Sequence, residues 1–288
     1  VHGLIGSETN MKETFDMIKK FSKDYELRLS SGTLRNYVYD LNCFFNYVQK
    51  GYEAIKSSDV REWLKNMMND GLKPSTIMNK ICCLKSFYKY LLEEELLNKS
   101  PVDNIRLPRI DGNLPFYLER EQLQRLRELT KDDPLERALV ETMYATGVRV
   151  SELINIKLDD IDWQSRKIII RDGKGQKERI VLFSNECEMR IKEYLKNRRE
   201  DSQYLFLGKQ GKPMYRFLLN YYFRKYSKKL GFKITPNTMR HTFAAHLAEK
   251  GMPFLYIQAL LGHDSPETTR VYARLYAHVR KKKYDMYM

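Results

Sequence analysis

A histidine and a tyrosine lie nine residues apart in the stretch LGHDSPETTRVY, residues 261–272. Both side chains can serve in proton transfer or nucleophilic attack. A purely structural explanation is also available, because Gly262 can end one helix and Ser265 can cap the next. His263 would then be a loop residue, and Tyr272 would be one of 20 tyrosines in a half-buried position. The stretch alone does not decide between chemistry and structure.

Two further patterns place charged side chains at chain turns. In ATGVRVSEL, Gly147 interrupts a helix, so Arg149 lies at a tight turn with Glu152 three residues ahead. In GKGQKER, Lys174 stands between two glycines that let the backbone bend sharply. A surface ion pair and a solvated lysine are the ordinary explanations of these patterns.

A fourth pattern lies on one helix, TPNTMRHTFAAHLAEKG, residues 235–251. Its first residues are a cap and a proline, and Gly251 ends it. Asn237 and Arg240 are three residues apart and therefore share a face. His241 and His246 suit ordinary packing positions.

The N-terminal hundred residues have the apolar periodicity of helices. Apolar side chains recur every three or four residues, which predicts four helices that span 11–28, 34–48, 58–68 and 74–92. Short connections between them favour a compact helical bundle. The stretch 98–115, rich in Pro, Gly and Asn, predicts a linker between domains.

The C-terminal part is predicted to be mostly helical with one small sheet. Helices are expected at 119–128 and 134–145. In KIIIRDGKGQKERIVLF, residues 167–183, two β-branched runs flank a polar turn, which predicts a hairpin. The fold class predicted for the whole chain is mainly α with a small β-sheet.

The positive charge of the chain is concentrated at one end. Residues 209–288 contain 16 Lys and Arg against four Asp and Glu, so they carry +12 of the total +14. A segment of this kind favours a polyanionic partner, most simply nucleic acid. No amphipathic basic anchor for a membrane surface stands out.

Metal, membrane and export functions find no support in the sequence. The four cysteines form no Cys-x-x-Cys pair and have no histidine at ligand spacing. No apolar run approaches the roughly 18 residues that a membrane helix needs, and the first residues lack the apolar core of a signal peptide. A cytoplasmic protein with no metal and no membrane contact is expected.

In combination, the four patterns resemble the tyrosine recombinases of the phage integrase family, and the Xer-like members most closely. The family's order is preserved from ATGVRVSEL through GKGQKER, N-x-x-R-H-T-F and LGH to the terminal tyrosine. SGTLRNYVYDL and the segment 73–109 look like its helical core-binding domain and linker. The resemblance covers residues 10–280 approximately. It implies an N-terminal helical, SAM-like core-binding domain and a C-terminal tyrosine-recombinase catalytic domain.

The resemblance also implies which residues act on DNA. Tyr272 would attack the scissile phosphate and form a 3′-phosphotyrosine intermediate. Arg149 and Arg240 would bind the non-bridging oxygens, because a planar guanidinium matches a phosphate with two hydrogen bonds. Lys174 would protonate the leaving 5′ oxygen, and His263 would donate a hydrogen bond to the phosphate.

Glu152, by the same resemblance, would steady the site without touching the phosphate. The phosphotyrosine ester conserves the energy of the broken bond, so a second strand's hydroxyl can reverse the reaction. The resemblance therefore implies that neither ATP, nor a metal, nor any other cofactor is required.

Asn237 departs from the family pattern, which has histidine three residues before the second arginine. An amide can donate or accept a hydrogen bond, but it cannot take a proton near neutral pH. We therefore treat Asn237 as a substituted catalytic position. His241 is expected to point away from the site, since one step along a helix turns the side chain by about 100°.

The implied organisation is a core-binding domain over residues 8–105, a linker over 106–115 and a catalytic domain over 116–288. The implied partner is double-stranded DNA, bound by a homotetramer that joins two sites with a dimer on each, with or without accessory proteins. Integration, excision or resolution are the implied reactions, and a mobile-element integrase fits. The C-terminal tail, 273–288, carries the basic run 280–283 and suits either a neighbouring subunit or DNA.

Two other functions remain open on the sequence. A DNA-binding protein of the same fold with attenuated catalysis would explain Asn237, although such a protein has no need of Tyr272. A type IB topoisomerase would use the same chemistry, but the Xer-like N-terminal domain disfavours it.

Overall fold

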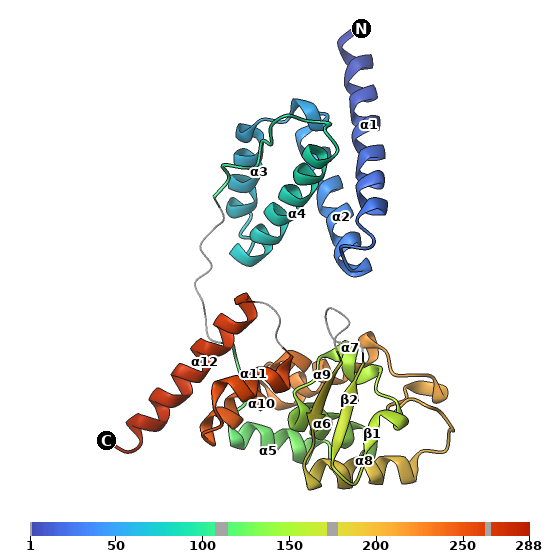
Figure 1. Cartoon of the computed structure of the whole chain (residues 1–288), viewed down its shortest axis with the longest axis vertical. Helices are drawn as coiled ribbons and strands as arrows, with labels where there is room; N and C mark the ends of the chain where they lie inside the picture. The colour runs from blue at the N-terminus through green and yellow to red at the C-terminus, as the bar shows by residue number, and fades with distance from the viewer. Residues whose placement is uncertain (1, 107–114, 172–177, 263–265) are drawn as a thin grey trace. The chain divides into compact units, whose positions relative to one another are not determined.

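The computed structural model describes residues 2–106, 115–171, 178–262 and 266–288 (Figure 1). The chain divides into two compact units, Val1–Asp111 and Gly112–Met288. Within the described residues, no helix has the length and apolar character needed to cross a bilayer.

The N-terminal unit is a bundle of helices, as its periodicity predicted. Its helices are α1 (His2–Asp24), α2 (Ser31–Val48), α3 (Ser57–Asn69) and α4 (Pro74–Glu93), with a short 3-10 turn at Tyr52–Ala54. Ser30 caps α2 by accepting a hydrogen bond from the backbone N–H of Thr33. The first helix ends at Asp24 rather than at the expected residue 28, because residues 25–28 already form the turn that leads to this cap.

Aromatic rings fill the centre of this bundle. Phe21, Phe45 and Phe87 are completely or almost completely buried. The ring of Phe87 meets those of Phe21 and Phe45 edge to face, an arrangement that aromatic quadrupoles favour. These contacts join α1, α2 and α4 into one core.

The C-terminal unit combines helices with a small antiparallel sheet. Its helices are α5 (Arg120–Leu129), α6 (Pro134–Thr146), α7 (Val150–Ile154), α8 (Asn185–Asn197), α9 (Arg216–Leu230), α10 (Pro236–Glu249), α11 (Phe254–Leu261) and α12 (Pro266–Asp285). Short 3-10 turns lie at Leu158–Asp160 and Lys209–Gly211.

The expected hairpin is present. Strands β2 (Lys167–Ile170) and β3 (Arg179–Leu182) pair antiparallel, with Ile168 opposite Val181. A short strand that the sequence did not predict, β1 (Ile161–Asp162), extends the sheet beside β2. The hairpin therefore places Arg179 at the first position of β3, opposite Ile170.

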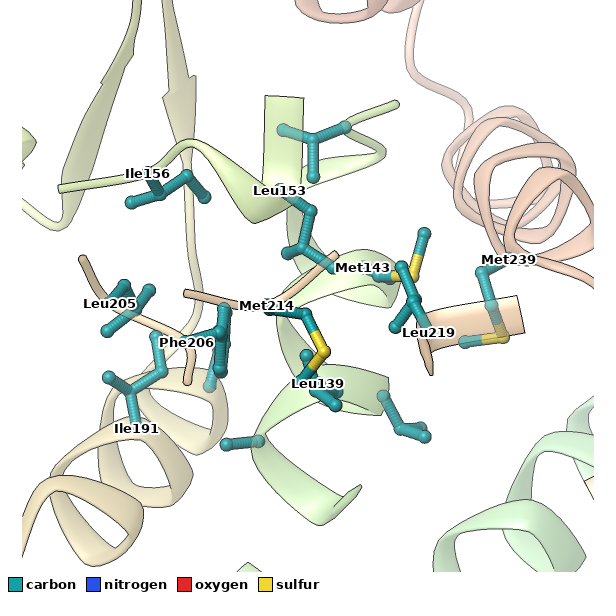
Figure 2. Close-up of a cluster of buried hydrophobic side chains, with 14 of the residues drawn as sticks. Leu139, Met143, Leu153, Ile156, Ile191, Leu205, Phe206, Met214, Leu219 and Met239 are labelled. Carbon is teal, nitrogen blue, oxygen red and sulfur yellow. The ribbon is translucent and has the colours of Figure 1, made fainter. Parts of the chain in front are cut away.

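A large apolar cluster gathers around α6 and holds this unit together. Figure 2 shows Leu139 and Met143 of α6 among side chains from α7, α8, α9 and α10. Leu153 of α7 and Met239 of α10 belong to the same cluster and are fully buried. The cluster thereby fixes α7 and α10, the two helices that carry the candidate arginines.

A second apolar cluster joins α10, α11 and α12, which lie together in Figure 1. Small residues of α10, among them Ala244 and Ala248, allow α12 to approach closely. Tyr272, Leu275 and Val279 of α12 are buried here at spacings of three and four residues. Tyr272 is thus a core residue of this cluster.

Two glycines end helices in the left-handed conformation, as expected from their positions. Gly147 has φ +62° at the end of α6, and Gly262 has φ +61° at the end of α11. A Cβ on Gly147 would lie 2.4 Å from a ring carbon of Phe243, and one on Gly262 would lie 2.7 Å from Cδ of Arg179. Both turns require glycine for conformation and for space.

Candidate active site

Arg149 and Arg240 converge on the C-terminal end of α11. Nη2 of Arg240 donates to the carbonyl of Leu261 at 2.7 Å, and Nη2 of Arg149 donates to the carbonyl of Gly262 at 2.8 Å. Nη1 of Arg240 also donates to the carbonyl of Gly147 at 2.6 Å. The last carbonyls of a helix lack intrahelical partners and form its negative end, which explains why cations collect there.

A third arginine, Arg179, reaches the same helix end. Its Nε donates to the carbonyl of Leu260 at 3.3 Å, so three consecutive carbonyls each accept from a different arginine. Arg179 ends the motif GKGQKER, in which only Lys174 was expected to act. Its importance follows from the burial of Glu152, which becomes visible only in the folded structure.

Glu152 lies between Arg149 and Arg179. Its side chain is 1% exposed, and its Oε1 accepts from Nη1 of each arginine at 2.7 Å. Its Oε2 accepts from Nη2 of Arg179 at 2.7 Å and from the backbone N–H of Arg149 at 2.6 Å. The expected pairing of Arg149 with Glu152 is therefore present, and it is a buried network rather than a surface pair.

The ionisation of Glu152 and Arg240 follows from these contacts. Burial by itself would raise the pKa of Glu152, but the hydrogen bonds from Arg179 and from the backbone of Arg149 lower it to about 2. Burial lowers the pKa of Arg240 to about 10. At neutral pH the site therefore holds an ionised carboxylate and a charged Arg240.

Tyr272 approaches the arginines from α12. It is 4% exposed. Burial raises the pKa of its phenol above the usual value, while a hydrogen bond and the charge of Arg240, and the charge of Arg149, act in the opposite direction. The hydroxyl is protonated at neutral pH, so an attack through this oxygen must transfer its proton.

His241 lies beside Tyr272, and the expectation that it points away from the site was wrong. The two ring centroids are 5.4 Å apart. Helix α12 packs along α10. Tyr272 therefore interacts with Arg240 through its phenol and with His241 through its ring. By contrast, His246 is a buried packing residue as expected, with Nδ1 3.1 Å from the hydroxyl of Tyr144.

Two predicted site residues, Lys174 and His263, lie outside the described residues. The geometry described here therefore concerns Arg149, Arg240 and Tyr272, which come from three elements separated along the chain. Among the residues with described positions, no group of three His, Cys, Asp or Glu is arranged to hold a metal ion.

Comparisons with known proteins identify the family. The sequence profile of the phage integrase family matches residues 117–278, and that of the phage integrase N-terminal SAM-like domain matches residues 18–95. The chain belongs to the phage integrase family. Both matches agree with the mainly α fold, its small sheet and its two kinds of domain.

Curated relatives within the phage integrase family are similar over nearly their whole length. The chain is 34% identical over 267 residues to the tyrosine recombinase XerA of Pyrococcus furiosus, covering 91% of this chain and 90% of that protein. It is 34% identical over 279 residues to the tyrosine recombinase XerC of Bacillus licheniformis, covering 90% and 91%. These relationships establish a site-specific recombinase of the tyrosine class.

A solved structure supports the same relationship. The XerH site-specific recombinase, bound to palindromic difH substrate in a post-cleavage complex, matches with a TM-score of 0.68 and 26% identity. The alignment covers 83% of this chain and 75% of that one.

Asn237, expected to be a substituted catalytic position, lines an open cleft. The cleft has a volume of about 500 Å³, and its lining includes Asn237, His241, Thr235, Arg216 and Lys233. Asn237 is exposed and lies one helical turn from His241, whose ring contacts Tyr272. A side chain at position 237 is thus directed toward the same cleft as the neighbour of Tyr272.

We expect His241 to make the stability of the C-terminal unit depend on pH. Burial, with the charge of Arg240, lowers its pKa from 6.5 to about 4, so between these values the unfolded chain binds more protons. The free energy of unfolding should therefore fall by up to about 3 kcal/mol as the pH drops from 6.5 to 4. Thermal unfolding of the wild type and His241→Gln across this range measures the contribution of His241, which the substitution should remove. The contribution of His246, whose pKa burial also lowers, should remain.

The matched control is His278→Gln, which removes an exposed histidine from α12. It should keep the wild-type pH dependence. An equally steep dependence in His241→Gln would contradict the assignment to His241. Glu152 acts in the same direction but at lower pH, because its pKa is lowered from 4.5 to about 2.

Proposed function

We propose that this recombinase cleaves double-stranded DNA through Tyr272 and rejoins it to a second duplex. The phenol oxygen attacks the scissile phosphorus, the bond from phosphorus to the 5′ oxygen breaks, and a 3′-phosphotyrosine forms. The 5′ hydroxyl of another strand then attacks the ester and releases Tyr272. One phosphodiester replaces another at each step, so the sequence of reactions needs no external energy source.

Arg149 and Arg240 bind the non-bridging oxygens of the phosphate in this proposal. The planar guanidinium of each arginine can donate two parallel hydrogen bonds to phosphate oxygens. Its positive charge offsets the negative charge that develops on the pentacoordinate intermediate. Glu152 holds Arg149 from behind through the 2.7 Å contact at Nη1. Arg240, which also interacts with the phenol, brings the phosphate and Tyr272 together.

One observation carries the proposal. Arg149, Arg240 and Tyr272 are up to 123 residues apart in sequence, yet both arginines bind adjacent carbonyls of one helix end and both act electrostatically on the buried phenol. A structural tyrosine needs no such cationic neighbours. A strand-cleaving nucleophile does, because it attacks an anion.

The remaining parts of the proposal come from the family. Lys174 protonates the 5′ oxygen as it leaves, and His263 donates a hydrogen bond to the phosphate. A homotetramer joins two DNA sites, with a dimer on each. The XerH structure with its difH substrate supports double-stranded DNA as the partner.

Covalent trapping on a nicked suicide substrate tests the function. A nick near the scissile phosphate lets the short 5′-hydroxyl fragment diffuse away, so the phosphotyrosine intermediate accumulates. Wild-type protein is incubated with a pool of candidate sites labelled at either end and resolved on a denaturing gel. A protease-sensitive band that retains the label upstream of the cut, with Tyr272 linked to DNA by mass spectrometry, is expected. Occupied DNA without any covalent band would instead support a DNA-binding protein that has lost catalysis.

Replacing Asn237 by histidine should accelerate cleavage. The phenol of Tyr272 must lose its proton, and an imidazole at position 237 supplies an acceptor on the face of α10 that carries His241. A well-placed general base contributes about 10²–10⁴-fold, so we expect the single-turnover rate to rise at least about tenfold. The rate should increase with pH as the new imidazole loses its proton.

Asn237→Gln is the matched control, because it retains an amide at the same position. It should cleave no faster than the wild type. Equal rates for the histidine and glutamine variants would show that position 237 does not handle the proton.

A further inference from the structure

Arg179 is more deeply placed than Arg149, although both contact Glu152. The side chain of Arg179 is 12% exposed, against 27% for Arg149. Arg179 begins β3, so the pairing of β3 with β2 fixes its backbone. Arg149 is therefore the arginine that faces an incoming phosphate, and Arg179 lies behind it.

The hydrogen bonds of Glu152 divide unequally between the two guanidinium groups. Arg179 contacts both carboxylate oxygens, Oε1 from Nη1 and Oε2 from Nη2, each at 2.7 Å. The Arg149 side chain contacts only Oε1, and its second terminal nitrogen donates to Gly262. The fork-to-fork pair thus belongs to Arg179, and such pairs are the strongest of their kind.

The net charge around Glu152 depends on Arg179. Glu152 with both arginines carries a net charge of +1, whereas Glu152 with Arg149 alone would be neutral. Without Arg179, the buried carboxylate would have Arg149 as its nearest cation and would hold it in a two-point contact. Arg149 would then be both less attractive to phosphate and less free to turn toward it.

Arg179 also supports the turn at the end of α11. Its Nε donates to Leu260, and its Cδ lies where a Cβ on Gly262 would have to fit. The next two carbonyls of this turn accept from Arg240 and Arg149. One side chain therefore sets the position of the carboxylate and of the backbone acceptors that orient the other two arginines.

We propose that Arg179 is a positioning residue for strand cleavage, which neutralises Glu152 so that Arg149 stays available to the scissile phosphate. This role rests on the proposed function of Arg149. It adds to that function a residue that does not itself touch DNA. Among the residues that the structure describes, the charged groups that act on Glu152 are Arg149, Arg179 and, at longer range, Arg240.

The test compares single-turnover cleavage of a suicide substrate with DNA affinity. We expect Arg179→Gln to slow cleavage by about 10²-fold, the size of effect that a misplacement of about 1 Å produces, while the Kd for DNA changes little. Adding Glu152→Gln removes the carboxylate that captures Arg149. The double variant should therefore cleave faster than Arg179→Gln alone, a rescue that a purely structural role for Arg179 would not give.

Arg171→Gln provides the matched control. Arg171 follows β2 and pairs at 2.5 Å with the buried Asp160 of the 3-10 turn Leu158–Asp160, so its loss also leaves a buried carboxylate without this arginine. It should cleave at the wild-type rate. If Arg179→Gln does not fold, Arg179→Lys takes its place, since it retains the charge but only one point of contact; its slower cleavage should likewise be relieved by Glu152→Gln.

Each outcome has a distinct meaning. Absence of covalent complex from the wild type would overturn the proposed function itself. A wild-type complex formed equally fast by Arg179→Gln would overturn only the positioning role. Slow cleavage that Glu152→Gln fails to relieve would also overturn it, because Arg179 would then act through the stability of the turn and not through Arg149.

Discussion

Replacing Tyr272 by phenylalanine should abolish the covalent DNA–protein complex. The substitution removes only the nucleophilic oxygen, and the ring keeps its place beside Leu275 and Val279 in the apolar cluster. DNA affinity and thermal stability should therefore remain close to those of the wild type. The measurement is covalent trapping on the suicide substrate, with binding measured separately by gel shift.

Tyr276→Phe is the control for this experiment. Tyr276 lies one turn further along α12, where its ring contacts that of Phe254 at 5.7 Å. The Tyr276→Phe variant loses the same oxygen at a position whose ring lies beside Arg280, and it should form the complex at the wild-type rate. A band that persists in Tyr272→Phe would identify another nucleophile and refute the central assignment.

Substituting lysine for Arg240 should reduce the rate of cleavage by about 10²–10³-fold, the cost of losing one preorganised donor. The charge is retained, but a lysine cannot reproduce the two-point contact with phosphate. One amino nitrogen would also replace the two nitrogens that donate to Gly147 and Leu261, and a buried carbonyl left without its donor costs about 1–3 kcal/mol. Single-turnover trapping and thermal unfolding of the same variant measure the two effects.

Arg137→Lys separates these effects. Arg137 is a buried arginine of α6 that pairs with Glu141 and Glu186, away from Tyr272. Its replacement should lower stability without slowing cleavage of bound DNA. If both lysine variants lose activity in proportion to their stability, Arg240 has no special part in the reaction.

The helices and the hairpin could be predicted because local patterns determine them. Apolar periodicity, Ser30 as a cap, and glycines at positions 147 and 262 carry their information within a few residues. The short strand β1 could not be predicted, since two residues hold no periodicity and the strand exists only through its pairing with β2.

Site residues could be predicted from the sequence only where they belong to a recognisable motif, as Arg149, Arg240 and Tyr272 do. The position of His241 was mistaken because a helical wheel gives the direction of a side chain but not the neighbour that α12 brings to it. Arg179 was overlooked because its importance depends on the burial of Glu152, which a linear sequence does not show. The acceptors for the arginines are backbone carbonyls. Because every residue has a carbonyl, the residue types at these positions do not predict the contacts.

The C-terminal end of α11 gives the site a property that its individual residues lack. One short helix supplies the acceptors for Arg149, Arg179 and Arg240, so a rigid-body shift of that helix would displace the three guanidinium groups in concert. Activity would then depend on the position of this one helix. The other end of α11 exposes Leu255 and Tyr256. A contact made at that surface lies at the opposite end of this eight-residue helix from the carbonyls that accept from the three arginines, so it could shift them by moving the whole helix.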